Sequence, residues 1–407
     1  MRTAVFCAAL AAVLVAASVG AQSLNLTEFD ALARLSADSP RARAVRAAVD
    51  IARADVLTAA RWPNPRITFD RESVAGVSEN IVMVAQPLPI TGRRGLDVQA
   101  ASALVSASAS RAQDEIRRLR ADLRLEFADL VAAQTREREL TTARDRLRDV
   151  ADVLAKREAA GDAAGFDRLR AEREVLDIDT DRVVAATDRA RAQAMLGSFF
   201  ADVPDPSRLL AVSRSTTPAA LPPLEALIEQ AESSRGELLA LGREIEAASF
   251  AERAADRRRI PEPEIVAGTK SSTVGSSDIG SVVTVHATIP LFDRARPERA
   301  LALARGAQAE ARANAFRLVL RGQIAALRAA VVDRRDAAER YRAQAMNSAD
   351  QIERIAQVSY DAGERSILEL LDAYRIGSSA RVRQATLDAT VRQAEIELEF
   401  ASGWEIQ

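Results

Sequence analysis

The sequence predicts a mainly helical protein with a small β part, built from two copies of one module. A Pro-x-Pro segment at residues 63–65 recurs at 261–263, 198 positions later, and the glycine at 161 recurs at 363. No proline lies between residues 94 and 160, so one very long helix is possible there. Solenoid units have periods of roughly 20 to 50 residues. We therefore interpret this longer repeat as a duplicated, domain-sized module.

The first copy, residues 22–197, is expected to contain a helix, a β-hairpin, a very long helix and a return helix. Prolines end the first helix because a residue before proline favours extended conformations. Polar and apolar residues then alternate, as in strands, and Ile81, Met83 and Ala85 share one face. Gly161 suits the left-handed position that closes a helix. The predicted elements are a helix from about Leu26 to Arg61, strands over about 66–74 and 80–87, a long helix over about 94–160 and a return helix over about 163–197.

The second copy, residues 224–403, repeats this order after a connector at 198–223 that is rich in proline. Its second strand shows the clearer alternation, because Ile279, Val283 and Val285 share one face while His286 lies on the other, polar face. The predicted elements are strands over about 264–270 and 278–289, a long helix over about 298–360 that ends near Gly363, and a return helix over about 364–402.

Residues 1–21 have the pattern of a secretory signal peptide. Arg2 precedes an apolar run from Ala4 to Val19, and small residues precede Gln22, where we expect the mature chain to begin. Cleavage of this signal peptide would remove Cys7, the only cysteine, so we expect no disulfide and no thiol chemistry in the mature chain. After Ala21 no uninterrupted apolar run is long enough for a membrane-spanning helix, so membrane contact is expected to be made by strands.

Four strands per chain are too few to close a barrel, and an open strand edge is not stable in lipid. Closure by several subunits solves this problem, and three chains would supply twelve strands. Such a trimer would form a 12-stranded β-barrel that is continued by a long α-helical coiled-coil barrel. At 1.5 Å per residue, each long helix would extend roughly 100 Å.

Several segments occur in equivalent places in the two copies. They are the two Pro-x-Pro entries, the strand exits Gln86 to Pro89 and Ile289 to Arg294, and the helix turns at 160–170 and 360–365. With these segments the chain resembles the TolC-like outer-membrane efflux proteins, and it looks most similar to the CzcC-like branch. The resemblance implies a passive exit duct in the outer membrane, with its helices in the periplasm. It also implies a homotrimer coupled through a periplasmic adaptor protein to an inner-membrane pump, of RND type in this branch, for export of heavy-metal ions.

The resemblance further implies that the glycine turns lie at the periplasmic tip, where helices form a gate and contact the adaptor. The alternative is that the acidic residues are ordinary solvated helix positions and the glycines plain helix caps. The residues implied for the gate are Asp167, Tyr360, Arg365 and Glu369, and those implied for adaptor contact are Gly161 and Gly363.

No enzyme, cofactor or metal site is expected. His286 is the only histidine, and one imidazole without neighbouring ligands makes a poor metal site. The 56 basic and 58 acidic side chains nearly balance, so nucleic acid is not an expected partner, whereas outer-membrane lipid is. Other possible functions are a duct for multidrug efflux or type I protein secretion, a soluble periplasmic adaptor, and a secreted structural coiled coil.

Overall fold

The computed structural model describes residues 23–35, 39–161, 165–213, 219–274 and 278–404, so the predicted signal peptide at 1–21 lies outside the described residues. The chain forms two compact units. The helical unit comprises residues 1–42, 117–227 and 323–407, and the sheet unit comprises 43–116 and 228–322. None of the described helices combines the length and the apolar character that crossing a bilayer requires.

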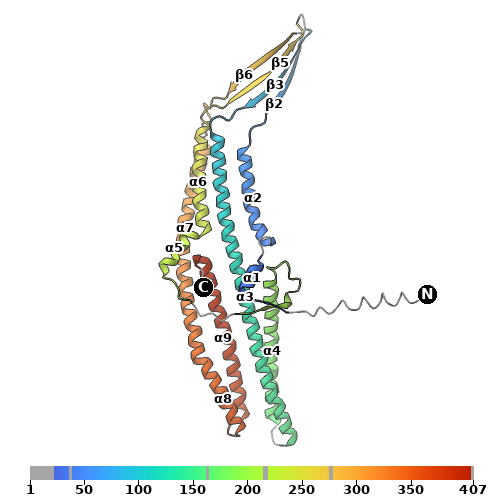
Figure 1. Ribbon diagram of the computed structural model, residues 1–407, viewed down its shortest axis with the longest axis vertical. Helices are drawn as coiled ribbons and strands as arrows, with labels where there is room; N and C mark the ends of the chain where they lie inside the picture. The colour runs from blue at the N-terminus through green and yellow to red at the C-terminus, as the bar shows by residue number, and fades with distance from the viewer. Residues whose placement is uncertain (1–22, 36–38, 162–164, 214–218, 275–277, 405–407) are drawn as a thin grey trace, which may run out of the picture. The chain divides into compact units, whose positions relative to one another are not determined.

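The sheet unit contains one antiparallel sheet in which the two predicted hairpins lie side by side (Figure 1). The strand order is β2-β3-β5-β6, so the hairpins join through β3 and β5. The last strand is shorter than predicted because its partner begins only at Pro263, which pairs with Ala287. The strands are β2 (Arg66–Val74), β3 (Val77–Pro87), β5 (Pro263–Ser272) and β6 (Asp278–Ala287).

The first hairpin turns in two residues, which is tighter than the turn of about five residues that the sequence suggested. Val74 pairs directly with Val77, and Ala75 and Gly76 between them both have positive φ, 50° and 81°. Two central residues with positive φ match the right-handed twist of paired strands. Strand β3 therefore begins at Val77, not near residue 80.

Helix α6 (Gly236–Arg257), which follows α5 (Leu224–Ser234), begins in close contact with a long helix of the sheet unit. A Cβ on Gly236 would lie 2.1 Å from the backbone oxygen of Ser110 in α3 (Arg93–Ala160), so only glycine fits there. Arg111 of α3 holds the same helix by ion pairs to Glu237 at 2.8 Å and Glu244 at 2.6 Å. The start of α6 is thus fixed against α3.

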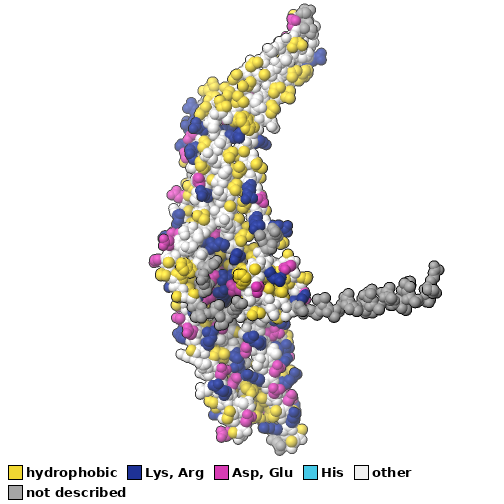
Figure 2. Space-filling model, in the orientation of Figure 1, with side chains coloured by type: hydrophobic (Ala, Val, Ile, Leu, Met, Phe, Trp, Pro, Cys, Tyr) yellow, Lys and Arg dark blue, Asp and Glu magenta, His cyan; other side chains and the backbone are white. Residues whose placement is uncertain are grey.

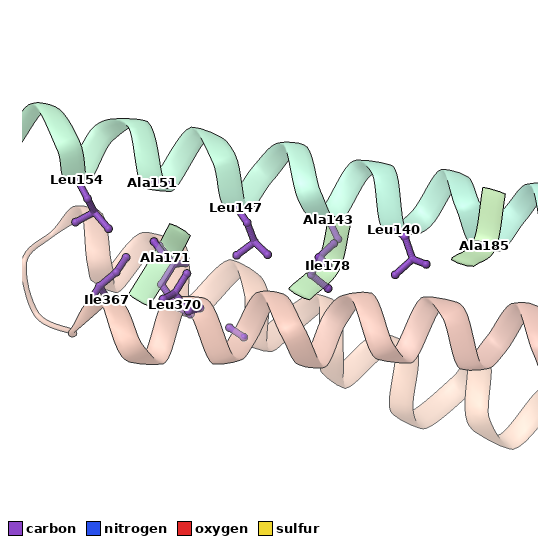
Figure 3. Packing of buried hydrophobic residues seen from close by; sticks show 13 residues of the cluster. Leu140, Ala143, Leu147, Ala151, Leu154, Ala171, Ile178, Ala185, Ile367 and Leu370 are labelled. Atoms are coloured by element: carbon purple, nitrogen blue, oxygen red, sulfur yellow. The ribbon is translucent and has the colours of Figure 1, made fainter. Parts of the chain in front are cut away.

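The core of the helical unit follows a seven-residue pattern. Leu140, Leu147 and Leu154 repeat along α3, and Ala171 and Ile178 repeat along α4 (Gly165–Gly197). Figure 3 shows the three α3 leucines pointing into the space between α3 and the ribbon that carries the labelled Ile367 and Leu370. A seven-residue apolar repeat is typical of left-handed coiled-coil packing. The same cluster also includes residues of α8 (Asn347–Asp361) and α9 (Ile367–Ser402).

The predicted helix over 298–360 is not one regular α-helix. It consists of α7 (Arg296–Tyr341), a π-helical turn at Arg342–Met346 and α8. In a π-helical turn the backbone hydrogen bonds span five residues and not four. In this protein, two side chains that follow the turn donate hydrogen bonds to carbonyl groups inside it. Asn347 donates to the carbonyl of Ala343 at 2.8 Å, and Ser348 donates to that of Gln344 at 2.7 Å.

Two segments near the ends of the first copy fold differently from the prediction. The expected helix from Leu26 to Arg61 is divided into β1 (Leu24–Leu26), α1 (Glu28–Arg34) and α2 (Pro40–Ala60), because Thr27 caps a new helix through a capping box with Asp30. The connector is not wholly irregular, since it contains a 3₁₀ turn at Pro206–Arg208 and the strand β4 (Leu209–Ala211). Strand β4 pairs in parallel with β1.

A largely buried network of charges joins both copies inside the helical unit. Arg124 on α3 bonds to Glu28 of α1 and to Glu399 of α9, whose side chain is only 4% exposed. Arg392 of α9 reaches the same Glu28 at 2.8 Å. Burial disfavours the charge on Glu28, but Arg392 and Arg124 outweigh this effect and hold its pKa below the ordinary 4.5. The network therefore stabilises the position of α1 against α3 and α9.

Candidate functional site

The first predicted tip turn closes α3. Gly161 has φ of 83°, and its N–H donates to the carbonyl of Glu158 at 2.9 Å. No atom lies within 4 Å of a Cβ added at Gly161, so backbone conformation and not space selects glycine. Residues 162–164 of the turn lie outside the described residues.

The second tip turn, between α8 and α9, forms a Schellman motif. Gly363 has φ of 73°, its N–H donates to the carbonyl of Tyr360 at 3.0 Å, and the N–H of Glu364 donates to that of Ser359 at 2.9 Å. These bonds satisfy two of the last carbonyls of α8. The turn occupies the first residues of the predicted return helix, so α9 starts at Ile367 and not near 364.

Three of the predicted gate residues have partners near this turn. Arg365 and Glu369, one helical turn apart, form an ion pair of 3.1 Å with both side chains about half exposed. The hydroxyl of Tyr360 accepts a hydrogen bond from Arg157 of α3 at 3.3 Å, and the guanidinium carbon lies 5.7 Å from the ring centroid. Asp167 forms no ion pair within the described parts of the chain. The structure thus brings Arg365 together with Glu369 but not with Asp167.

Some charged residues that lie at the tip were not singled out from the sequence. Arg168 of α4 bonds to Glu158 of α3 and to Glu172 at 2.6 Å, so it connects the two helices across the first turn. The hydrogen bonds to Glu158 and Glu172 raise the pKa of Arg168. An arginine ten residues after a glutamate across a glycine turn is a signal that could have predicted this link.

The second helix pair is connected just behind its turn. Arg381 of α9 bonds to Glu353 of α8 and lies 3.0 Å from Asp350. Burial raises the pKa of Tyr374, which donates a hydrogen bond to Gln357. These contacts link α8 to α9.

An apolar stripe remains exposed on α4 near the tip. Leu169, Leu176 and Val183 lie seven residues apart and are half exposed or more. On α8, Ile355 and Val358 are likewise exposed. Heptad spacing on an outer face favours packing against further helices. The helical unit therefore carries apolar surface that is suited to contact with another chain.

The sheet has one apolar face that is open to its surroundings. The pairing places Ile67 and Phe69 of β2 and Val283 and Val285 of β6 on this face, and all four are more than 60% exposed. Figure 2 shows hydrophobic atoms over much of the visible sheet. In β3 the residues on this face are Val82 and Val84, whereas Ile81, Met83 and Ala85 share the opposite face.

The opposite face of the sheet is more polar. Lys270 and Glu79 form an ion pair of 2.6 Å there, and His286 lies opposite Glu264 on the same face. Among the described residues, no group of three or more His, Cys, Asp or Glu side chains could hold a metal ion. The sheet ends at β2 and β6, so each carries one edge that no other described strand pairs with.

Long helices with glycine turns, together with a small sheet that exposes an apolar face, have the fold of TolC-like channel proteins. The structure of CusC has a TM-score of 0.74 and 14% identity, covering 94% of this chain and 93% of that chain. VceC from Vibrio cholerae has a TM-score of 0.74 and 15% identity, covering 93% and 97%. At these identities the likeness shows the fold alone.

In sequence, the chain is similar to outer-membrane efflux proteins. The model described as "Outer membrane efflux protein" matches residues 227–404. The nickel-cobalt-cadmium resistance protein NccC of Alcaligenes xylosoxydans xylosoxydans is 28% identical over 325 residues, 75% of this chain and 71% of that protein. The nickel and cobalt resistance protein CnrC of Cupriavidus metallidurans is 28% identical over 294 residues, 69% and 67%. The second copy of this chain thus matches the outer-membrane efflux protein family, and the chain has the fold of TolC-like channels.

Proposed function

We propose that this outer-membrane efflux channel is a passive exit duct for heavy-metal ions, coupled through a periplasmic adaptor protein to an inner-membrane pump of RND type. The two relatives named for nickel and cobalt resistance support this cargo. The observation that carries the membrane part of the proposal is the apolar sheet face, because aliphatic side chains as exposed as Val283 (75%) and Ile279 (77%) are best accommodated by lipid.

The proposed assembly is a homotrimer. Each chain offers the open edges of β2 and β6, and pairing β6 of one copy with β2 of the next would close twelve strands. In such a barrel the face with Val283 meets lipid, and the face with His286 and the Lys270–Glu79 ion pair lines the interior. The polar interior then agrees with a water-filled exit path.

The proposed gate lies at the helix tips. Asp167 has no ion-pair partner among the described residues of its own chain, while Arg365 and Glu369 are half exposed, so these groups are accessible to neighbouring copies. At a narrow tip, arginine–carboxylate pairs are stronger than exposed pairs in bulk water, which contribute about 0 to 1 kcal/mol. We infer that Tyr360 narrows the same opening, and that the turns at Gly161 and Gly363 contact the adaptor.

Membrane fractionation and conductance measurements test the duct and its gate. The protein is expected to remain in the outer membrane after salt and carbonate washing and to stay trimeric in mild detergent. In planar bilayers, Arg365→Ala or Asp167→Asn should raise single-channel conductance. Arg383→Ala removes an exposed arginine of α9 that lies roughly 24 Å along the helix from its first residue, and it should leave conductance unchanged. Equal conductance in all variants would refute the gate.

Deletion of the gene in its host tests the cargo. Loss of tolerance to nickel, cobalt or cadmium salts, restored by the wild-type gene, supports metal export. Unchanged metal tolerance with loss of drug tolerance, or with failure to secrete a polypeptide, would instead assign the duct to multidrug efflux or type I secretion. A protein released by salt washing as a soluble monomer would contradict the duct altogether.

A further inference from the structure

Positive charge is concentrated at one end of the sheet. The segments that connect the strands to the helices of the sheet unit hold ten arginines and six acidic residues, although acidic residues slightly outnumber basic ones in the whole chain. The opposite strand ends, residues 71–80 and 270–280, hold two basic and three acidic residues. The connecting segments are residues 61–66, 90–97, 256–264 and 288–299.

Six of these ten arginines have no carboxylate partner within the described residues. Among the other four, for example, Arg258 bonds to Glu298, and Arg299 bonds to Glu252 at 2.8 Å. We call the six without a carboxylate partner the junction arginines. They are Arg61, Arg66, Arg94, Arg257, Arg294 and Arg296.

Exposed apolar side chains lie in the same segments. Ile289, Leu291 and Phe292 follow β6 and are all more than 60% exposed, and Phe292 is 99% exposed. Arg94 lies over the ring of the half-exposed Trp62, with its guanidinium carbon 5.1 Å from the ring centroid. Figure 2 shows Lys and Arg atoms beside hydrophobic surface where the sheet gives way to helices. Water alone solvates the arginines well but not these apolar groups.

We propose that the junction arginines bind the phosphate groups of anionic phospholipid, such as phosphatidylglycerol, in the periplasmic leaflet of the outer membrane. The inference rests on the proposed function, in which the apolar sheet face lies in lipid. Aromatic residues flank the apolar band of membrane barrels at the headgroup level, which matches Trp62 and Phe292 at the strand ends. Unpaired guanidinium groups beside such residues complement lipid phosphates, and the opposite strand ends lack this excess of positive charge.

The magnitude follows from surface electrostatics. One arginine near an anionic membrane surface strengthens association about fivefold. The triple variant R257Q/R294Q/R296Q should therefore weaken the preference for phosphatidylglycerol over phosphatidylethanolamine on the order of 100-fold at low salt. The matched control R305Q/R312Q/R317Q removes the same charge from α7, at about 13 Å or more beyond Arg296. It should keep the wild-type preference.

The measurement is lipid retention by the full-length protein in detergent, with phosphatidylglycerol and phosphatidylethanolamine added in equal amounts and counted by native mass spectrometry. Retention of phosphatidylglycerol by the wild type and the control, its loss in the triple variant, and no competition by inorganic phosphate support the proposal. Equal retention by all three proteins, or displacement of the lipid by inorganic phosphate, would overturn it. Outer-membrane fractionation and trimer formation of the same variants are measured in parallel, so that a failure of the duct itself is distinguished from a failure of lipid binding.

Discussion

Replacing Arg124 with methionine should destabilise the helical unit strongly. The side chain is 17% exposed and bonds to both Glu28 and Glu399. After the substitution, the buried Glu399 would keep only Arg392 at 4.0 Å, and its Oε1 atom already has no hydrogen bond. Glu28 would be less affected, because it remains paired with Arg392 at 2.8 Å. The cost therefore comes mainly from one uncompensated buried carboxylate.

Breaking a buried ion pair by removing one partner costs about 3 to 5 kcal/mol. We expect about 3 kcal/mol at neutral pH, because part of the network survives. In a unit of roughly this size, 1 kcal/mol shifts the melting temperature by about 2 to 4 °C. Thermal unfolding of the detergent-purified protein, followed by circular dichroism, should therefore show a decrease on the order of 10 °C.

The double variant Arg124→Met with Glu399→Met makes the prediction specific to the charge. Replacing both partners with apolar residues is often neutral or stabilising, so the double variant should regain most of the lost stability. Arg383→Met, at an exposed position of α9, serves as the control and should melt like the wild type. If the single variant melts within about 1 °C of the wild type, or if the double variant is no more stable than the single one, the reasoning is wrong.

Three further substitutions test other parts of the structure. The pKa of Glu28 in the folded protein lies below 4.5, so its contribution to the free energy of unfolding is complete above about pH 4.5 and is lost as the pH falls through the lowered value. Glu28→Gln should therefore make the melting temperature depend less on pH between about pH 3 and 6. A pH profile equal to that of the wild type would contradict this. Gly363→Ala places a Cβ at φ of 73° and should cost about 1 kcal/mol in thermal melts, whereas no loss would argue against the turn geometry. Gly268→Ala would place its Cβ 2.0 Å from a β3 carbonyl oxygen and should reduce the yield of trimer on native gels. Gly280→Ala would place its Cβ at an ordinary contact distance, 3.9 Å from the carbonyl oxygen of Lys270, and should assemble normally.

Local sequence patterns made much of the fold predictable, but they did not predict the short strands or the π-helical turn. The Pro-x-Pro entries and the alternation after them placed both hairpins, because proline and side-chain period act within a few residues. Strands β1 and β4 have three residues each and pair across more than 180 positions, so no periodic pattern could indicate them. The π-turn after Tyr341 was missed because its residues continue a helical pattern.

The site was predictable to different degrees. Gly161 and Gly363 have the left-handed conformation that their position after a long helix suggested. The contact of Tyr360 with Arg157 could not be read from the sequence, because it joins residues 203 positions apart. Alternation along β3 already predicted that Ile81, Met83 and Ala85 share one face, but only the pairing with β2 and β5 shows that this face also carries Lys270 and is the more polar one.

The order of the two hairpins, the long helices and the glycine turns was determined by the sequence itself, because proline and glycine act through steric constraints within a few residues. Tertiary structure decided that the two hairpins join in one sheet with a common apolar face, how Arg124 joins the two copies, and which charges at the tip are already paired. Those features depend on the register between segments that are far apart in the chain, and the energies of local conformation carry no information about that register.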